Sequence, residues 1–203
     1  DGTYFFAMEY VEGETLQSII DRRGRLEIGE ALTLAETLAS VLAYGWNERH
    51  LIHGDIKPEN IMVDTKGRLK LMDLGVARIA QQAHDGSAIM LTPLYAAPEL
   101  IRGEVGQHGI ASDVYAFGAT LYHMLAGHPP FPGTDPQTVM RKQVEAPPPK
   151  IHVFFPQIPV CVSDMLDRTL LKNPGERFRT WEEIQVLLQD LRLHCEQEVD
   201  EIE

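Results

Sequence analysis

The chain of 203 residues is long enough for one domain or two small ones, and its hydrophobic fraction of 44% excludes a disordered protein. Its 30 acidic and 18 basic residues give a net charge of -12, which argues against nucleic acid or an anionic membrane as partner, because a surface of this sign repels them. No signal peptide is visible, and the longest apolar run, 114–127, is too short to span a bilayer. Cys161 and Cys195 have no paired spacing and are typical of reduced thiols in the cytoplasm.

The first half of the sequence predicts a strand, two helices and a hairpin. Residues 4–11 are rich in aromatic and β-branched side chains and predict a buried strand that Gly13 ends. Because the chain opens on this strand, we expect it to begin inside a larger fold. Helices are predicted over 15–21 and 28–47, the second with an apolar stripe formed by Leu32, Ala35, Leu38, Ala39 and Leu42. Strands at 61–64 and 68–75 are predicted to pair across a turn.

The second half is predicted to be mainly helical. Residues 76–98 show no period, which indicates a long irregular segment of the kind that is usually functional. A buried helix is predicted from about Asp113, and the prolines of 127–136 end it. Helices over 138–144 and 162–171 follow. The last helix starts at a capping box formed by Thr180 and Glu183.

The stretch HGDIKPENIMV, residues 53–63, carries the clearest chemistry. Asn60 and, across the hairpin, Asp73 offer an amide oxygen and a carboxylate, the hard ligands that suit Mg²⁺ arriving on phosphates. Asp55 can accept a proton from an attacking hydroxyl, and Lys57 can offset charge on a transferred phosphoryl group. The spacing therefore favours phosphoryl transfer.

These residues also carry a resemblance to protein kinases. HGDIKPENIMV, DLG at 73–75 and PLYAAPE at 93–99 resemble, in order, the catalytic loop, the metal-binding motif and the end of the activation segment in that family. The resemblance implies that Asp55 orients the acceptor hydroxyl, that Lys57 assists, and that Asn60 and Asp73 bind Mg²⁺. The sequences of these motifs are similar to those of bacterial-type Ser/Thr kinases. The position of Lys57, two residues after Asp55, implies that the acceptor is Ser or Thr and not Tyr.

Further motifs extend the resemblance along nearly the whole chain. AMEYVEGETL, residues 7–16, resembles the last strand of the N-terminal lobe and the hinge that binds adenine. This implies that Met8 is the gatekeeper, that the backbone of Glu9 and Val11 hydrogen-bonds adenine, and that Met62 is the floor of the adenine pocket.

The resemblance assigns five more residues to structural support. SDVYAFG, residues 112–118, resembles the start of the buried F helix, whose Asp113 braces the catalytic loop. NPGERF, residues 173–178, implies a buried ion pair between Arg177 and Glu99. Thr92 matches the threonine that contacts the catalytic Asp and Lys, and we expect His53 to be a hydrogen-bonded core histidine.

Two features depart from the family pattern. The 203 residues contain neither the Gly-rich loop over the phosphates nor the strand Lys with its helix Glu partner, so we expect this chain alone to catalyse poorly. Gly54 stands where the family has an Arg that meets a phosphorylated activation loop. This exchange puts control through phosphorylation of the loop, with Ser87 as the acceptor, in question without removing a catalytic group.

The sequence therefore predicts a protein kinase-like α+β fold. We expect the last N-lobe strand and hinge over 1–13, a mainly α-helical C-terminal lobe with a short β-hairpin at the active site over 14–195, and an acidic tail over 196–203, with the N-terminal lobe essentially absent. The predicted function is a cytoplasmic, ATP- and Mg²⁺-dependent Ser/Thr protein kinase that acts on protein substrates.

Two other functions stay open. A pseudokinase or interaction module would account for the missing motifs, although it has no chemical need for Asp55, Lys57, Asn60 and Asp73. A small-molecule phosphotransferase is also consistent with HGD, but the APE segment and Asp113 argue against it.

Overall fold

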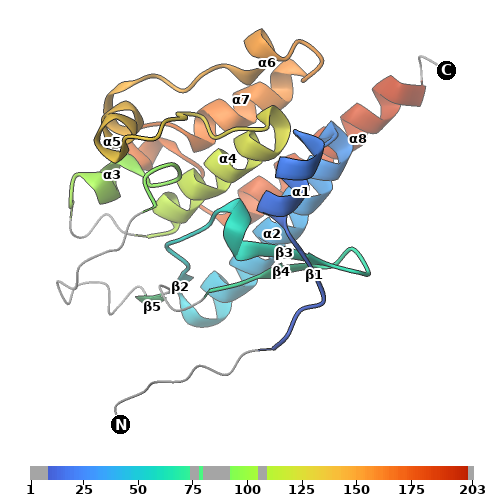
Figure 1. Cartoon of the computed structure of the whole chain (residues 1–203), viewed down its shortest axis with the longest axis horizontal. Helices are drawn as coiled ribbons and strands as arrows, with labels where there is room; N and C mark the ends of the chain where they lie inside the picture. Colours follow the sequence, from blue (N-terminus) through green and yellow to red (C-terminus); the bar gives the residue numbers. More distant parts are fainter. Residues whose placement is uncertain (1–8, 74–77, 80–91, 105–108, 201–203) are drawn as a thin grey trace.

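The computed structural model of the chain describes residues 9–73, 78–79, 92–104 and 109–200, which form mostly helices with a few short strands (Figure 1). The helices are α1 (Leu16–Arg23), α2 (Ile28–Arg49), α3 (Pro98–Ile101), α4 (Ile110–Ala126), α5 (Pro136–Glu145), α6 (Ile151–Phe154), α7 (Val160–Thr169) and α8 (Trp181–Asp200), with 3₁₀ turns η1 (Pro58–Asn60) and η4 (Pro174–Glu176). The strands are β1 (Gly13–Thr15), β2 (Leu51–Ile52), β3 (Ile61–Asp64), β4 (Leu69–Leu71) and β5 (Arg78–Ile79).

Helix α4 forms the centre of the helical body. Every side chain from Ser112 to Ala126 is buried, because α4 is apolar on most of its surface and packs between α2 and α7. Helices α2 and α8 lie side by side along the same body (Figure 1). Trp181 of α8 packs edge-on against Phe117 of α4, with ring centroids 5.7 Å apart. This packing holds α4 in place, and α4 carries Asp113.

The sequence predicts most helices correctly. The helix expected over 28–47 is confirmed as α2, and its predicted apolar stripe is buried. Helices α1, α5 and α7 lie where they were predicted, with slightly different ends, while α4 begins before Asp113, at Ile110. The short helix α6 was not predicted, because four residues are too few to show a helical period.

A small antiparallel sheet, in the order β1-β3-β4, lies at one end of the helical body (Figure 1). The predicted hairpin is confirmed: β3 has the predicted bounds, and Ile61 pairs with Leu71 of a shorter β4. In β1, Gly13 lies opposite Asp64. A Cβ atom at Gly13 would lie 2.2 Å from the carbonyl oxygen of Val63, so the glycine permits the close approach of β1 to β3.

The prediction of a buried strand that Gly13 ends is wrong for the part that the structure describes. Residues 9–12 have no regular structure, and the Tyr10 side chain is 88% exposed. Gly13 pairs with Asp64, the last residue of β3, so residues 9–12 run past the end of that strand and lie opposite the turn that follows it. The glycine begins a strand instead of ending one. Residues 4–8 lie outside the described ranges.

The start of α8 shows one half of the predicted capping box. The Glu183 amide donates to the Thr180 hydroxyl at 3.2 Å. The Glu183 carboxylate lies 3.4 Å from Arg168 of α7 and so ties the start of α8 to that helix. Helix α8 continues to Asp200, so the acidic tail begins within it. Of the helices that the structure describes, none has the length and apolar character that a membrane crossing requires.

Candidate active site

The loop 53–57 connects β2 to η1, and Asp113 of α4 anchors its backbone. One Asp113 oxygen accepts the His53 amide at 2.7 Å, and the other accepts the Gly54 amide at 2.9 Å. Burial raises the pKa of Asp113, and the two amide donors oppose this effect. The His53 ring is buried, with Nε2 at 3.0 Å from the Met72 carbonyl oxygen. The loop is therefore fixed through its backbone to the most buried helix of the fold.

Gly54 lies at the sharpest point of this loop. Its φ of 79° falls in the left-handed region, which costs residues with a Cβ roughly 1–2 kcal/mol. The glycine adopts this angle without strain while its amide reaches Asp113. Glycine at this position therefore suits the loop backbone, and the side chains around Asp55 are all present.

Three side chains converge on the Asp55 carboxylate. The Thr92 hydroxyl donates to Oδ1 at 2.7 Å. The Lys57 ammonium lies 2.6 Å from Oδ2, and the Asn60 amide nitrogen donates to the same oxygen at 2.8 Å. Lys57 also donates to the Thr92 hydroxyl at 2.9 Å, which closes a ring of contacts around the carboxylate.

These contacts keep Asp55 ionised. Burial alone would raise the pKa of Asp55, but the hydrogen bonds from Lys57, Thr92 and Asn60, with the charge of Lys57, hold the pKa below its usual value. A carboxylate with a lowered pKa is a weak base but a well-oriented acceptor. The arrangement is therefore suited to aligning a hydroxyl more than to holding its proton.

The hairpin brings Asn60 and Asp73 to the same end of the site. The Met72 amide donates to the Asn60 carbonyl oxygen at 2.7 Å, so Asp73 follows directly after a residue bonded to Asn60. Asp73 is exposed and has a φ of 61°, an angle that Asp tolerates better than most residues. In the described ranges, no three His, Cys, Asp or Glu side chains could hold a metal ion together. One amide and one exposed carboxylate suit Mg²⁺ that is already bound by phosphates.

Tyr95 connects the segment that carries Thr92 to α4. Its hydroxyl lies 2.8 Å from His123 Nδ1, and both side chains are buried. Burial raises the pKa of Tyr95. Burial, assisted by the charge of His128, lowers the pKa of His123 to about 4, against a small opposite effect of Asp21 and the Gly127 backbone. The contact between the two rings is thus between neutral groups at neutral pH.

The His123 shift makes the stability of the fold depend on pH. The unfolded chain takes up a proton near pH 6.5 that the folded chain takes up only near pH 4, so we expect stability to fall as the pH drops through this window. The full loss attributable to this side chain is roughly 3 kcal/mol. His123→Asn should flatten the slope of unfolding free energy against pH, measured by urea denaturation. Exposed His50 offers the control His50→Asn, and a His123→Asn slope equal to that of this control would contradict the assignment.

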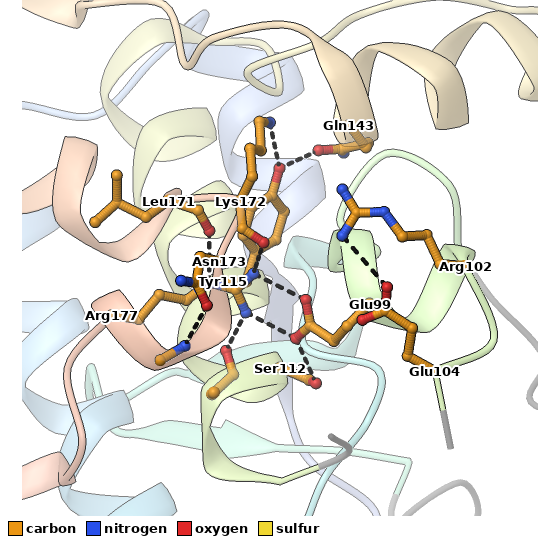
Figure 2. A network of polar contacts seen from close by, with 12 residues as sticks. Glu99, Arg102, Glu104, Ser112, Tyr115, Gln143, Leu171, Lys172, Asn173 and Arg177 are labelled. Atoms are coloured by element: carbon orange, nitrogen blue, oxygen red, sulfur yellow. Dashed lines mark hydrogen bonds and ion pairs between the residues drawn. The ribbon is translucent and has the colours of Figure 1, made fainter. Parts of the chain in front are cut away.

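Glu99 and Arg177 form a buried ion pair behind the site (Figure 2). Both side chains are 0% exposed, and the guanidinium donates to the two carboxylate oxygens at 2.7 and 2.8 Å. Burial alone would raise the pKa of Glu99, but Arg177 and the Ser112 hydroxyl hold it below its usual value. Arg177 also donates to the carbonyl oxygens of Leu171 and Ala111. The pair joins α3, α4 and η4.

The residues assigned to adenine are less completely described. Met8 lies outside the described residues, as does Ser87, the predicted acceptor in the loop. Glu9 is exposed, and its carboxylate pairs with Lys70 of β4. Val11 is half-buried, and Met62 of β3 lies cross-strand from Lys70. The hairpin thus lies next to the segment 9–11.

The sequence reading missed a second group of polar residues, Tyr115, Gln143 and Lys172. Tyr115 lies on the buried helix α4, and its hydroxyl bonds Gln143 of α5. Burial, with the charges of Arg177 and Arg102, lowers the pKa of Lys172 to about 8. One signal was present: Gln143 follows Val139 by four residues, which puts a polar side chain on the buried face of an amphipathic helix.

The fold is that of a protein kinase domain. The chain matches the protein kinase domain over residues 1–188 and therefore belongs to the protein kinase family. It is 32% identical over 188 residues to the serine/threonine-protein kinase PrkC of Bacillus subtilis, which covers 91% of this chain and 28% of PrkC. It is 35% identical over 180 residues to PknA of Mycobacterium tuberculosis, covering 88% and 40% of the two chains. With PknB of Mycobacterium leprae the identity is 32% over 196 residues, covering 95% and 31%.

The resemblance to bacterial Ser/Thr kinases is thus confirmed as homology over most of the chain. The chain spans between 28% and 40% of the length of the PrkC and PknA relatives. Members of the protein kinase family use ATP and Mg²⁺ and act on proteins.

Proposed function

We propose that this chain is the hinge and catalytic C-terminal lobe of a bacterial-type Ser/Thr protein kinase, which transfers the γ-phosphate of ATP to Ser or Thr hydroxyls of proteins in the cytoplasm. The observation that carries the proposal is the convergence of Lys57, Asn60 and Thr92 on Asp55 at 2.6 to 2.8 Å. A scaffold has no need for a partly buried carboxylate held by three donors. A phosphoryl transfer enzyme depends mainly on such positioning and charge stabilisation.

Each side chain has a role in this proposal. Asp55 accepts a hydrogen bond from the attacking hydroxyl and orients it. Lys57 offsets the negative charge of the phosphoryl group in transit. Asn60 and Asp73 would hold Mg²⁺ at the phosphates, and the nucleotide supplies the phosphoryl group when bound.

Each part of the chain corresponds to a part of the proposed kinase domain. Residues 1–13 contribute the last strand of the N-terminal lobe and the hinge, with Met8, Glu9, Val11 and Met62 around adenine. Residues 14–195 form the C-terminal lobe. Because the strand Lys and the Gly-rich loop are not among the 203 residues, efficient turnover should need a longer form that carries them.

The direct test is phosphate transfer to a protein acceptor with Mg·ATP, followed by mass spectrometry of the modified residues. We compare the 203-residue chain with a longer form that carries the two missing motifs. Phosphoserine or phosphothreonine from the longer form supports the proposal. Thermal stabilisation by Mg·ATP without any transfer would indicate an interaction module instead, and phosphorylation of aminoglycosides or choline but not protein would indicate the small-molecule enzyme.

Asp73→Asn is expected to weaken Mg·ATP binding. The substitution keeps the size and the left-handed backbone of the site but removes the one carboxylate that faces the metal in our proposal. A magnesium titration of thermal stability at constant ATP should need at least about tenfold more metal for the same shift. Asp164→Asn on the exposed face of α7 serves as the control, and equal titration curves for the two variants would remove Asp73 from the metal site.

A further inference from the structure

Gln143 of α5 is a buried amide with partners on both sides. Its side chain is 0% exposed. The amide nitrogen donates to the Pro93 carbonyl oxygen at 3.1 Å and to the Leu94 carbonyl oxygen at 2.8 Å. The amide oxygen accepts from the Tyr115 hydroxyl of α4 (Figure 2). The Gln143 amide therefore bridges α4 and the segment of residues 92–95.

The orientation of this amide is set from the side of α4. Lys172 donates to the Tyr115 oxygen at 3.4 Å, so the hydroxyl proton of Tyr115 is directed at the Gln143 oxygen (Figure 2). The amide nitrogen is then directed at the two carbonyl oxygens. Only a side chain that both donates and accepts can satisfy all three partners, because an isosteric carboxylate would face the carbonyls with a second acceptor.

The segment that Gln143 holds is the one that reaches the Asp55 carboxylate. Thr92 bonds Asp55 directly, and Pro93 and Leu94 follow it. The amides of Tyr95 and Ala96 both bond the Thr92 carbonyl oxygen at 3.1 Å, so the segment is one tight turn. An acceptor hydroxyl bonded to Asp55 would therefore lie next to this turn.

We propose that Gln143 is a positioning residue for the protein acceptor: by clamping the carbonyl oxygens of Pro93 and Leu94 it holds residues 92–95 in the conformation that admits the acceptor to Asp55. The inference rests on the proposed kinase function. It assigns Gln143 no part in nucleotide binding, because none of the partners of Gln143 is a residue assigned to adenine or metal.

The test compares Gln143→Met with Gln137→Met. Methionine keeps the length of glutamine without its hydrogen bonds, and Gln137 is an exposed residue of the same helix. In the longer active form, Gln143→Met should raise the KM for a peptide acceptor about tenfold, the effect of losing a hydrogen bond or two, and leave the KM for ATP within about twofold. In the 203-residue chain, the Tyr95 and Ala96 amides should exchange hydrogen faster than in Gln137→Met.

A second variant separates positioning from stability. Gln143→Met leaves the Tyr115 hydroxyl without its acceptor, and Tyr115→Phe added to it removes that buried polar group. The double variant should regain melting temperature but keep the raised acceptor KM. Recovery of KM together with stability would overturn the proposal, as would equal rises in both KM values.

The outcomes distinguish this proposal from the one on which it rests. A parent protein that transfers no phosphate would refute the kinase function. Hydrogen exchange would then still show whether Gln143 holds residues 92–95 in place. Faster exchange of the Tyr95 and Ala96 amides in Gln143→Met supports this contact, and exchange equal to that of Gln137→Met overturns it.

Discussion

Asp55→Asn is expected to lower turnover of the longer, active form by about 10²–10⁴-fold, the range typical of losing a side chain that binds and orients the attacking hydroxyl. Asparagine keeps the shape of the side chain but loses the charge that Lys57 faces at 2.6 Å and presents one acceptor oxygen in place of two. Thr92 and Asn60 would then compete for that one oxygen. The acceptor hydroxyl loses its orientation.

ATP binding should survive the same substitution. Asp55 makes its contacts with Lys57, Thr92 and Asn60, and the residues assigned to adenine lie elsewhere. We therefore expect a nucleotide-dependent thermal shift close to that of the parent, with the loss confined to kcat. Exposed Asp190 of α8 gives the matched control Asp190→Asn, which should keep parental turnover. Turnover of Asp55→Asn within a few-fold of this control would refute the role of Asp55.

The short distance along the chain explains why the sequence alone could predict that the side chains of Asp55, Lys57 and Asn60 come together. They lie within six residues, and a short loop followed by η1 leaves their side chains few ways to point. The hairpin that brings Asp73 back is equally local, since β3 and β4 are joined by one turn. Homology supplied the distant partners Thr92 and Asp113, which spacing alone would not have placed.

The parts that were not predicted depend on contacts across the chain. Gly13 was taken for the end of a strand, whereas its lack of a Cβ allows β1 to approach Val63, and only the partner strand reveals this. Strand β5 forms two residues of ladder with β2, too short for any alternation to show. The role of Gln143 depends on Tyr115 and Leu94, which lie 28 and 49 residues away.

Arg177→Met is expected to destabilise the fold by about 3–5 kcal/mol, because it leaves the Glu99 carboxylate buried without its countercharge. Ser112 would remain as a neutral donor to Glu99. The change also leaves the carbonyl oxygens of Leu171 and Ala111 without this donor. A loss of this size is a large part of the stability of a typical domain, so part of the protein should be unfolded at 37 °C. Urea denaturation of the 203-residue chain measures it.

The control is a pair of the same residue types that is exposed to water. Arg22 lies 3.0 Å from Glu14 with 61% and 53% of the two side chains exposed, so Arg22→Met should cost less than about 1 kcal/mol. Adding Glu99→Leu to Arg177→Met removes the unpaired charge and should recover much of the loss. Recovery of the unfolding free energy should stay incomplete, because the carbonyl oxygens that accepted hydrogen bonds from Arg177 lose this donor. A loss in Arg177→Met no larger than in Arg22→Met would mean that the buried charge finds water or a proton, and that the pair does not join α3 to the core.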